Sequence, residues 1–167
     1  EGASYIYPDA WEKYLSPISH DKRDDMILAY YEILTGDDIG KRYEAAKAWA
    51  IWEASTSKLI QNKKSLHHFE DSQVADIFSR IECHYFINKG FFEYDGWLLD
   101  QIDKIRHIPS VIIQGRYDVV CPMVTAWDLH KAWPEADFHI IADSGHSMLE
   151  DGIRSKLIEY TNKFLKL

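Results

Sequence analysis

The chain has 167 residues, a length typical of one domain or slightly more. Its formal net charge of −8 disfavours a protein that binds nucleic acids independently of sequence, because such proteins need a basic surface that displaces counterions from phosphates. Hydrophobic residues make up 46% of the chain, which is enough for a sizeable core. No stretch approaches the roughly 18 consecutive apolar residues of a membrane span, so we expect no membrane partner.

The first eight residues, Glu1–Pro8, lack an initiator Met and the basic and apolar regions of a secretory signal peptide. The two cysteines, Cys83 and Cys121, lie far apart in the sequence and form no CxxC motif. We therefore expect reduced thiols and a cytoplasmic protein rather than a disulfide framework.

Helical patterns fill the chain from Asp9 to about Ile108. The expected helices run from Pro8 to Pro17, from Asp21 to Leu34, from Asp38 to about Ile60, from Ser72 to Asn88 and from Trp97 to Arg106. Ser72 is the expected N-cap of the fourth of these helices, and Gly90 is expected to end it.

The C-terminal part of the chain has a different pattern. Val111–Gln114 is short, apolar and rich in β-branched residues, which is typical of a strand buried on both faces of a parallel sheet. A helix over Met123–Trp133, a strand over Phe138–Ala142 and a helix from about Gly152 to Leu167 complete a β-α-β-α unit with parallel strands. Because two strands alone leave a parallel sheet poorly covered, we expect residues 109–167 to be the end of a larger α/β sheet.

Two loops follow the expected strands, and in α/β sheets such loops carry the functional groups. The first contains Asp118 and the second contains His146. An Asp and a His on consecutive strand ends, in this order, are two of the three members of a hydrolase triad, in which the carboxylate orients the imidazole that deprotonates a nucleophile. No G-x-S-x-G motif occurs in these 167 residues, so we expect the serine to lie elsewhere in a longer protein. Each loop alone also fits a structural turn, and only the joint pattern favours catalysis.

Several stretches of the sequence resemble the proline iminopeptidase (prolyl aminopeptidase) family of serine peptidases. They are Gly115–Pro122, Ala126–Pro134 and Ser144–Ser147, and in the helical half Ala46–Trp49 with Trp52-Glu53, and Arg80–Phe86. The resemblance implies an α/β-hydrolase fold. Residues 1–108 would form a mostly helical cap domain and the return to the core, and residues 109–167 the C-terminal βαβα portion of that core. The chain would thus correspond to about the C-terminal half of a family member.

The resemblance also implies roles for four residues. Asp118 would be the triad acid and His146 the triad base, while Glu53 and Glu82 would hold the free amino terminus of the substrate. The implied activity is release of N-terminal proline from peptides, with the serine and oxyanion hole supplied by the missing N-terminal half of the core. No metal or organic cofactor is implied. The family pattern leads us to expect Asn beside Glu82, where this chain has Cys83.

The residues around the two glutamates are compatible with this role. In the expected helix Glu82 is four positions from both Phe78 and Phe86, and Glu53 adjoins Trp52. A carboxylate among aromatic side chains requires a cation or a hydrogen-bond donor. The protonated amine of an N-terminal proline would supply both, while aromatic faces would pack its ring.

Alternatives to this interpretation remain. Without the family resemblance, both glutamates would be read as solvated residues of amphipathic helices. An esterase or amidase would share the fold and the triad, and a non-catalytic fragment or binding module would keep the cap without a nucleophile. His67-His68 with Glu70 and Asp71 lack the spacing of a metal site, so a solvated polar loop is expected there.

Overall fold

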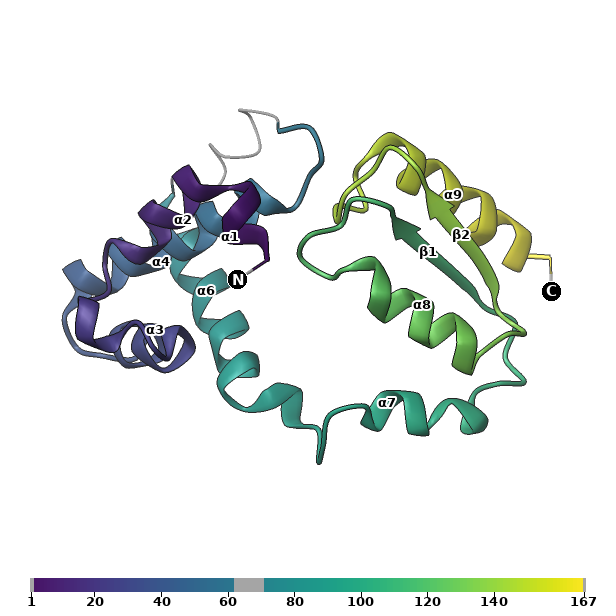
Figure 1. Cartoon of the computed structure of the whole chain (residues 1–167), viewed down its shortest axis with the longest axis horizontal. Coiled ribbons are helices and arrows are strands. Elements are labelled where there is room, and N and C mark those ends of the chain that lie inside the picture. The colour runs from purple at the N-terminus through teal and green to yellow at the C-terminus, as the bar shows by residue number, and fades with distance from the viewer. Residues whose placement is uncertain (1, 62–70, 167) are drawn as a thin grey trace. The chain divides into compact units, whose positions relative to one another are not determined.

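A computed structural model describes residues 2–61 and 71–166 of the chain. The chain divides into two compact units, one formed by Glu1–Thr56 with Gln61–Phe92 and the other by Ser57–Ile60 with Glu93–Leu167. Figure 1 shows packed helices in the first unit and two strands with helices in the second. The structure is thus mixed helix with a small sheet, compatible with a helical cap and part of an α/β sheet.

The regular elements in the described part of the first unit are helices. Its elements are α1 (Ala3–Ile6), α2 (Pro8–Leu15), η1 (His20–Lys22), α3 (Met26–Leu34), α4 (Ile39–Thr56), α6 (Ser72–Ile87) and η3 (Lys89–Phe91). Helix α4 packs against α2, α3 and α6. Small side chains at Ala45, Ala46 and Ala50 let its neighbours approach closely, and the rings of Tyr30 and Trp49 fill the space between the helices.

Helices α3 and α6 of this unit begin where a carboxylate caps them. Asp25 Oδ1 accepts a hydrogen bond from Leu28 N at 3.0 Å, so α3 starts at Met26, later than the start predicted at Asp21. The predicted cap at Ser72 is wrong by one residue, because Asp71 Oδ1 accepts from the backbone amides of Gln73 and Val74. A charged acceptor also interacts favourably with the helix dipole there.

Helix α4 ends four residues before the predicted position. In its final turns the hydroxyls of Ser55 and Thr56 donate to Ile51 O and Trp52 O. The segment that follows, Ser57–Ile60, makes its hydrogen bonds with the second unit instead of continuing the helix. A long-range contact therefore overrides the helical propensity of this segment.

The second unit contains the β-α-β-α pattern that the sequence predicts. Its elements are α7 (Trp97–Asp100), η4 (Ile102–Lys104), β1 (Val111–Gly115), α8 (Met123–Ala132), β2 (Asp137–Ile141) and α9 (Asp151–Phe164). The two strands pair in parallel, with Val111 opposite Asp137 and Gly115 opposite Ile141, which confirms the predicted topology. In Figure 1 the strands lie between α8 and α9.

Two details of this unit differ from prediction. The single helix expected over Trp97–Arg106 is wrong, because the chain leaves helical geometry at Gln101, between α7 and η4, and Ile102 packs against Trp133 and Ala136. The residues of β1 are half-buried except for Gly115, rather than buried on both faces, because a two-stranded sheet covers little of each strand.

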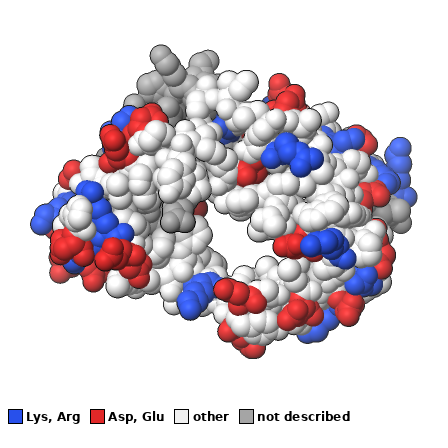
Figure 2. Space-filling view, in the orientation of Figure 1, with Lys and Arg blue, Asp and Glu red and all other residues white. Residues whose placement is uncertain are grey.

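Acidic and basic side chains are mixed over the described part of the face in Figure 2, rather than gathered into a patch of one sign. Within residues 2–61 and 71–166, no helix combines the length and the apolar character that crossing a membrane requires.

Candidate functional site

The predicted acid and base are hydrogen-bonded in the second unit. His146 Nδ1 lies 3.0 Å from Asp118 Oδ2, and the two side chains come from the loops that follow β2 and β1. The Asp118 side chain is 5% exposed, whereas that of His146 is 39% exposed. A carboxylate accepts at Nδ1, so this nitrogen carries the proton and Nε2 is left as the basic nitrogen of a half-exposed ring.

Asp118 is held by four donors, of which His146 is only one. Its Oδ1 accepts from the backbone amides of Val120 and Cys121 at 3.0 and 2.8 Å. Its Oδ2 also accepts from Gln114 Nε2 at 3.2 Å, and the same amide group donates to Cys121 O at 3.0 Å. These bonds fix the position and orientation of the carboxylate. Gln114 was not singled out from the sequence, although a polar residue that ends an apolar strand is a usable signal.

Gly115 brings the two loops into direct backbone contact. A Cβ atom at this position would lie 1.9 Å from Gly145 O and 2.7 Å from Ser144 O, so only glycine fits. Next to it, Arg116 N donates to Ile141 O and Tyr117 N donates to Ser144 O. Main-chain hydrogen bonds therefore continue over the first two residues after β1, which sets the spacing of acid and base.

The loop that carries His146 is also attached to the segment after α4. The backbone amides of His146 and Ser147 both donate to Ser57 O, at 3.1 and 2.7 Å. Glu150 bridges the same two segments, since Oε1 accepts from Gly145 N at 2.9 Å and Oε2 from Leu59 N at 3.2 Å. Neither Ser57 nor Glu150 was predicted, because the contacts of Ser57 with His146 and of Glu150 with Leu59 span about 90 residues of the chain.

The two predicted substrate-binding carboxylates lie in the first unit, one on α4 and one on α6. Both are half-buried. Trp49 Nε1 donates to Glu82 Oε2 at 2.6 Å. Burial, and next the negative charge of Glu82, raise the pKa of Glu53 to about 7. Full solvation of both glutamates, the alternative expected without the family resemblance, does not fit their half-buried positions.

Cys83, which departs from the family pattern, is buried, and its Sγ lies 3.7 Å from Ile27 O. Burial, and next the charge of Glu82, raise the pKa of the Cys83 thiol to about 11. The thiol is therefore neutral at physiological pH and belongs to the core, and the hydrogen bond to Glu82 comes from Trp49 instead.

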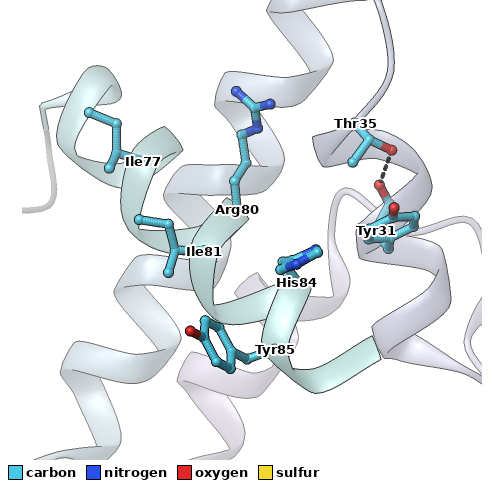
Figure 3. Close-up of a pocket in the computed structure, with 7 residues that line it drawn as sticks. All are labelled: Tyr31, Thr35, Ile77, Arg80, Ile81, His84 and Tyr85. Atoms are coloured by element: carbon cyan, nitrogen blue, oxygen red, sulfur yellow. Dashed lines mark hydrogen bonds between the residues drawn. The ribbon is translucent and has the colours of Figure 1, made fainter. Parts of the chain in front are cut away.

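A pocket of about 450 Å³ between α3 and α6 contains none of the four predicted residues. Figure 3 shows Ile77, Arg80, Ile81 and His84 along one side of it. Arg80 and His84 stand two positions before and after Glu82 and so project from another face of the helix.

Metal-binding chemistry finds no support in the described residues, where no group of three His, Cys, Asp or Glu side chains could hold an ion. The His67-His68 pair and Glu70 lie outside the described residues. Asp71 is the N-cap of α6.

The chain is similar in sequence to proteins named proline iminopeptidase. It is 58% identical over 165 residues to a probable proline iminopeptidase of Leptolyngbya boryana, with 99% of the chain and 51% of the relative covered. It is 49% identical to a proline iminopeptidase of Arabidopsis thaliana and 38% identical to one of Neisseria gonorrhoeae, which are covered to 44% and 51%. The chain is a homologue of proline iminopeptidases.

The resemblance to proline iminopeptidase that the sequence motifs indicate is therefore confirmed along nearly the whole chain. The chain spans about half the length of the curated proline iminopeptidases it matches. No protein-family model matches it.

Proposed function

We propose that the complete protein is a proline iminopeptidase, a serine aminopeptidase of the α/β-hydrolase fold that releases N-terminal proline from peptides. Residues 1–108 form its helical cap and the return to the core, and residues 109–167 form the last βαβα portion of the core. The nucleophilic serine and the oxyanion hole come from the N-terminal half of the core, outside these 167 residues. The names of the relatives and their extent support this assignment.

The observation that carries the proposal is the hydrogen bond between His146 Nδ1 and Asp118 Oδ2. It leaves Nε2 of a partly exposed ring as the proton acceptor, which is the arrangement a serine hydrolase needs. The donors around Asp118 hold its carboxylate in place against His146, where a triad carboxylate stabilises the imidazolium formed when the histidine takes a proton.

In the proposed reaction, His146 Nε2 takes the hydroxyl proton of the serine while its oxygen attacks the carbonyl carbon of the terminal proline. The imidazolium then gives this proton to the departing peptide amine as the C–N bond breaks, which leaves a prolyl ester on the serine. Water attacks this ester, His146 takes the water proton and returns it to the serine oxygen, and free proline leaves. No metal or organic cofactor takes part.

Glu53 and Glu82 confine the reaction to the first peptide bond by binding the protonated secondary amine of the substrate. Half-buried carboxylates form stronger contacts with such a cation than exposed ones do. The indole that donates to Glu82, that of Trp49, lies with its ring 6.0 Å from the ring of Phe86. Peptides that begin with proline are thus the proposed partners, and reduced thiols at Cys83 and Cys121 fit a cytoplasmic protein.

Hydrolysis of proline naphthylamide by the complete protein tests this proposal. We expect His146→Ala to lower kcat by about 10⁴-fold or more, and Glu82→Gln to lower kcat/KM at least about tenfold, because a charge-assisted hydrogen bond is lost. N-acetylproline naphthylamide, which has no amine cation, should be a very poor substrate.

Glu159→Gln is the matched control for the second variant, since Glu159 lies on α9 and pairs with Lys156 in an exposed position. Its kcat/KM should equal that of the unmodified protein. Equal turnover of the acetylated substrate, or unchanged kcat/KM in Glu82→Gln, would instead favour an esterase or amidase.

A further inference from the structure

Trp49 connects the aromatic core of the first unit to one of the two half-buried carboxylates. The side chain belongs to α4, and the residue is 1% exposed. Its indole N–H, the only polar group of the ring, donates to Glu82 Oε2 on α6 over 2.6 Å. A hydrogen bond to a charged acceptor in such a buried place is stronger than one at the surface.

The indole ring is fixed by its neighbours. Its centroid lies 5.1 Å from that of Tyr30 in an edge-on arrangement and 5.8 Å from that of Tyr14. Tyr30 is itself held by a hydrogen bond from its hydroxyl to Tyr14 O. Because the ring cannot rotate without disturbing this cluster, its N–H points in one direction and determines where the Glu82 carboxylate lies.

The same contact distinguishes Glu82 from Glu53. Glu53 follows Trp49 by one helical turn on α4, close enough to Glu82 for the two charges to repel each other. When two carboxylates share a site, the one that accepts a strong hydrogen bond retains its charge, and the other takes up a proton more readily. Glu82 accepts the indole hydrogen bond, and its negative charge contributes, after burial, to the raised pKa of Glu53.

We propose that Trp49 is a positioning residue for substrate binding, whose indole N–H holds the Glu82 carboxylate in the orientation that accepts the substrate ammonium group. This inference rests on the proposed role of Glu82. It adds a residue that touches neither the substrate nor the reacting atoms and acts on affinity through Glu82.

The test is Trp49→Phe in the complete protein, which retains an aromatic ring and removes the N–H. We expect KM for proline naphthylamide to rise about tenfold while kcat changes by less than about twofold. Trp133→Phe is the matched control, because it removes a buried indole hydrogen bond to Arg106 O in the other unit. The control should leave KM unchanged.

A double-mutant cycle with Glu82→Gln separates positioning from general damage. In the Glu82→Gln protein, which has already lost the charge, Trp49→Phe should raise KM by less than about twofold. An equal rise in both backgrounds, or a fall in kcat with KM unchanged, would show a merely structural role and overturn the inference.

The outcomes also distinguish this inference from the proposed function. If Glu82→Gln raises KM and Trp49→Phe does not, the inference alone is wrong, and if neither variant changes KM, the proposed role of Glu82 is wrong. Should Trp49→Phe unfold at the assay temperature, Glu82→Asp replaces it, since this change keeps the charge and withdraws it from the indole. An unchanged KM in Glu82→Asp would overturn the inference, and a rise of about tenfold would support it.

Discussion

Glu53 and Glu82 are the same residue type and lie close together, but their environments differ. Glu82 accepts the indole hydrogen bond, whereas the pKa of Glu53 is raised by burial and by the charge of Glu82. The other titratable groups close to this pair, Tyr14 and Cys83, both have raised pKa values and remain neutral near pH 7. Between pH 6 and 8, Glu53 is therefore the group of this cluster that changes its charge.

Substrate affinity should follow the ionisation of Glu53. With a pKa of about 7, Glu53 gains its charge as the pH rises from 6 to 8, and KM for proline naphthylamide should fall by about tenfold over this range. In Glu53→Gln this dependence should disappear, while any change of kcat that comes from His146 persists. A KM that depends equally on pH in both proteins would contradict the assignment.

Protein stability should fall as the pH rises, whereas substrate affinity should increase. The pKa of Glu53 is about 7 in the folded protein and near its ordinary value of 4.5 in the unfolded chain, so the folded state holds more proton between these values. The free energy of unfolding contributed by this group therefore decreases as the pH rises through that window. Glu53→Gln should remove this contribution, which urea denaturation at pH 5 and pH 8 measures.

At the scale of elements, helices and strands could be predicted from local patterns, but their ends could not. The parallel pairing of β1 and β2 followed from apolar runs and the intervening helix. The end of α4 could not be predicted, because Ser57 O and Leu59 N form hydrogen bonds with residues about 90 positions later in the chain. Likewise the order of Asp118 and His146 indicated the pair. Gln114 lies four positions from Asp118 and could have been found as the polar end of an apolar strand, whereas the contact between Glu150 and Leu59 spans 91 positions and has no local signal.

Glu150 offers a test of how the histidine loop is held. Glu150→Ala removes the acceptors of Gly145 N and Leu59 N, so we expect the free energy of unfolding to fall by about 1–3 kcal/mol and kcat to fall while KM changes little. Hydrogen exchange of the Gly145 and Leu59 amides should accelerate together. Glu159→Ala, which removes an exposed acceptor on α9, is the control and should leave both amides protected. Unchanged exchange in Glu150→Ala would show that the bridge is dispensable.

At the scale of the whole molecule, the chain consists of two units that carry different parts of the proposed chemistry. Glu53 and Glu82 lie in the helical unit, and Asp118 and His146 lie at the end of the sheet in the other. The relatives are about twice as long as this chain. The sequence predicted a longer protein because Asp118 and His146 occur without a G-x-S-x-G motif. The remaining strands of the sheet could not be predicted from these 167 residues.

A preparation of residues 1–167 alone should therefore not hydrolyse proline naphthylamide above the rate of buffer, because an imidazole without a serine has no nucleophile to activate. The complete protein, measured in parallel at the same molar concentration, should be active. Mass spectrometry of both samples excludes contamination by a longer species. Turnover by the 167-residue species that His146→Ala abolishes would overturn the assignment of the nucleophile.

The close approach of bare main chain at Gly115 has a consequence for how such a protein can vary over evolutionary time. Since carbonyl oxygens of one turn occupy the space where a methyl group of the other would stand, an added residue in either turn displaces both. We therefore expect insertions and deletions to occur outside these two turns. The spacing of Asp118 and His146 is then kept while the surrounding side chains are replaced.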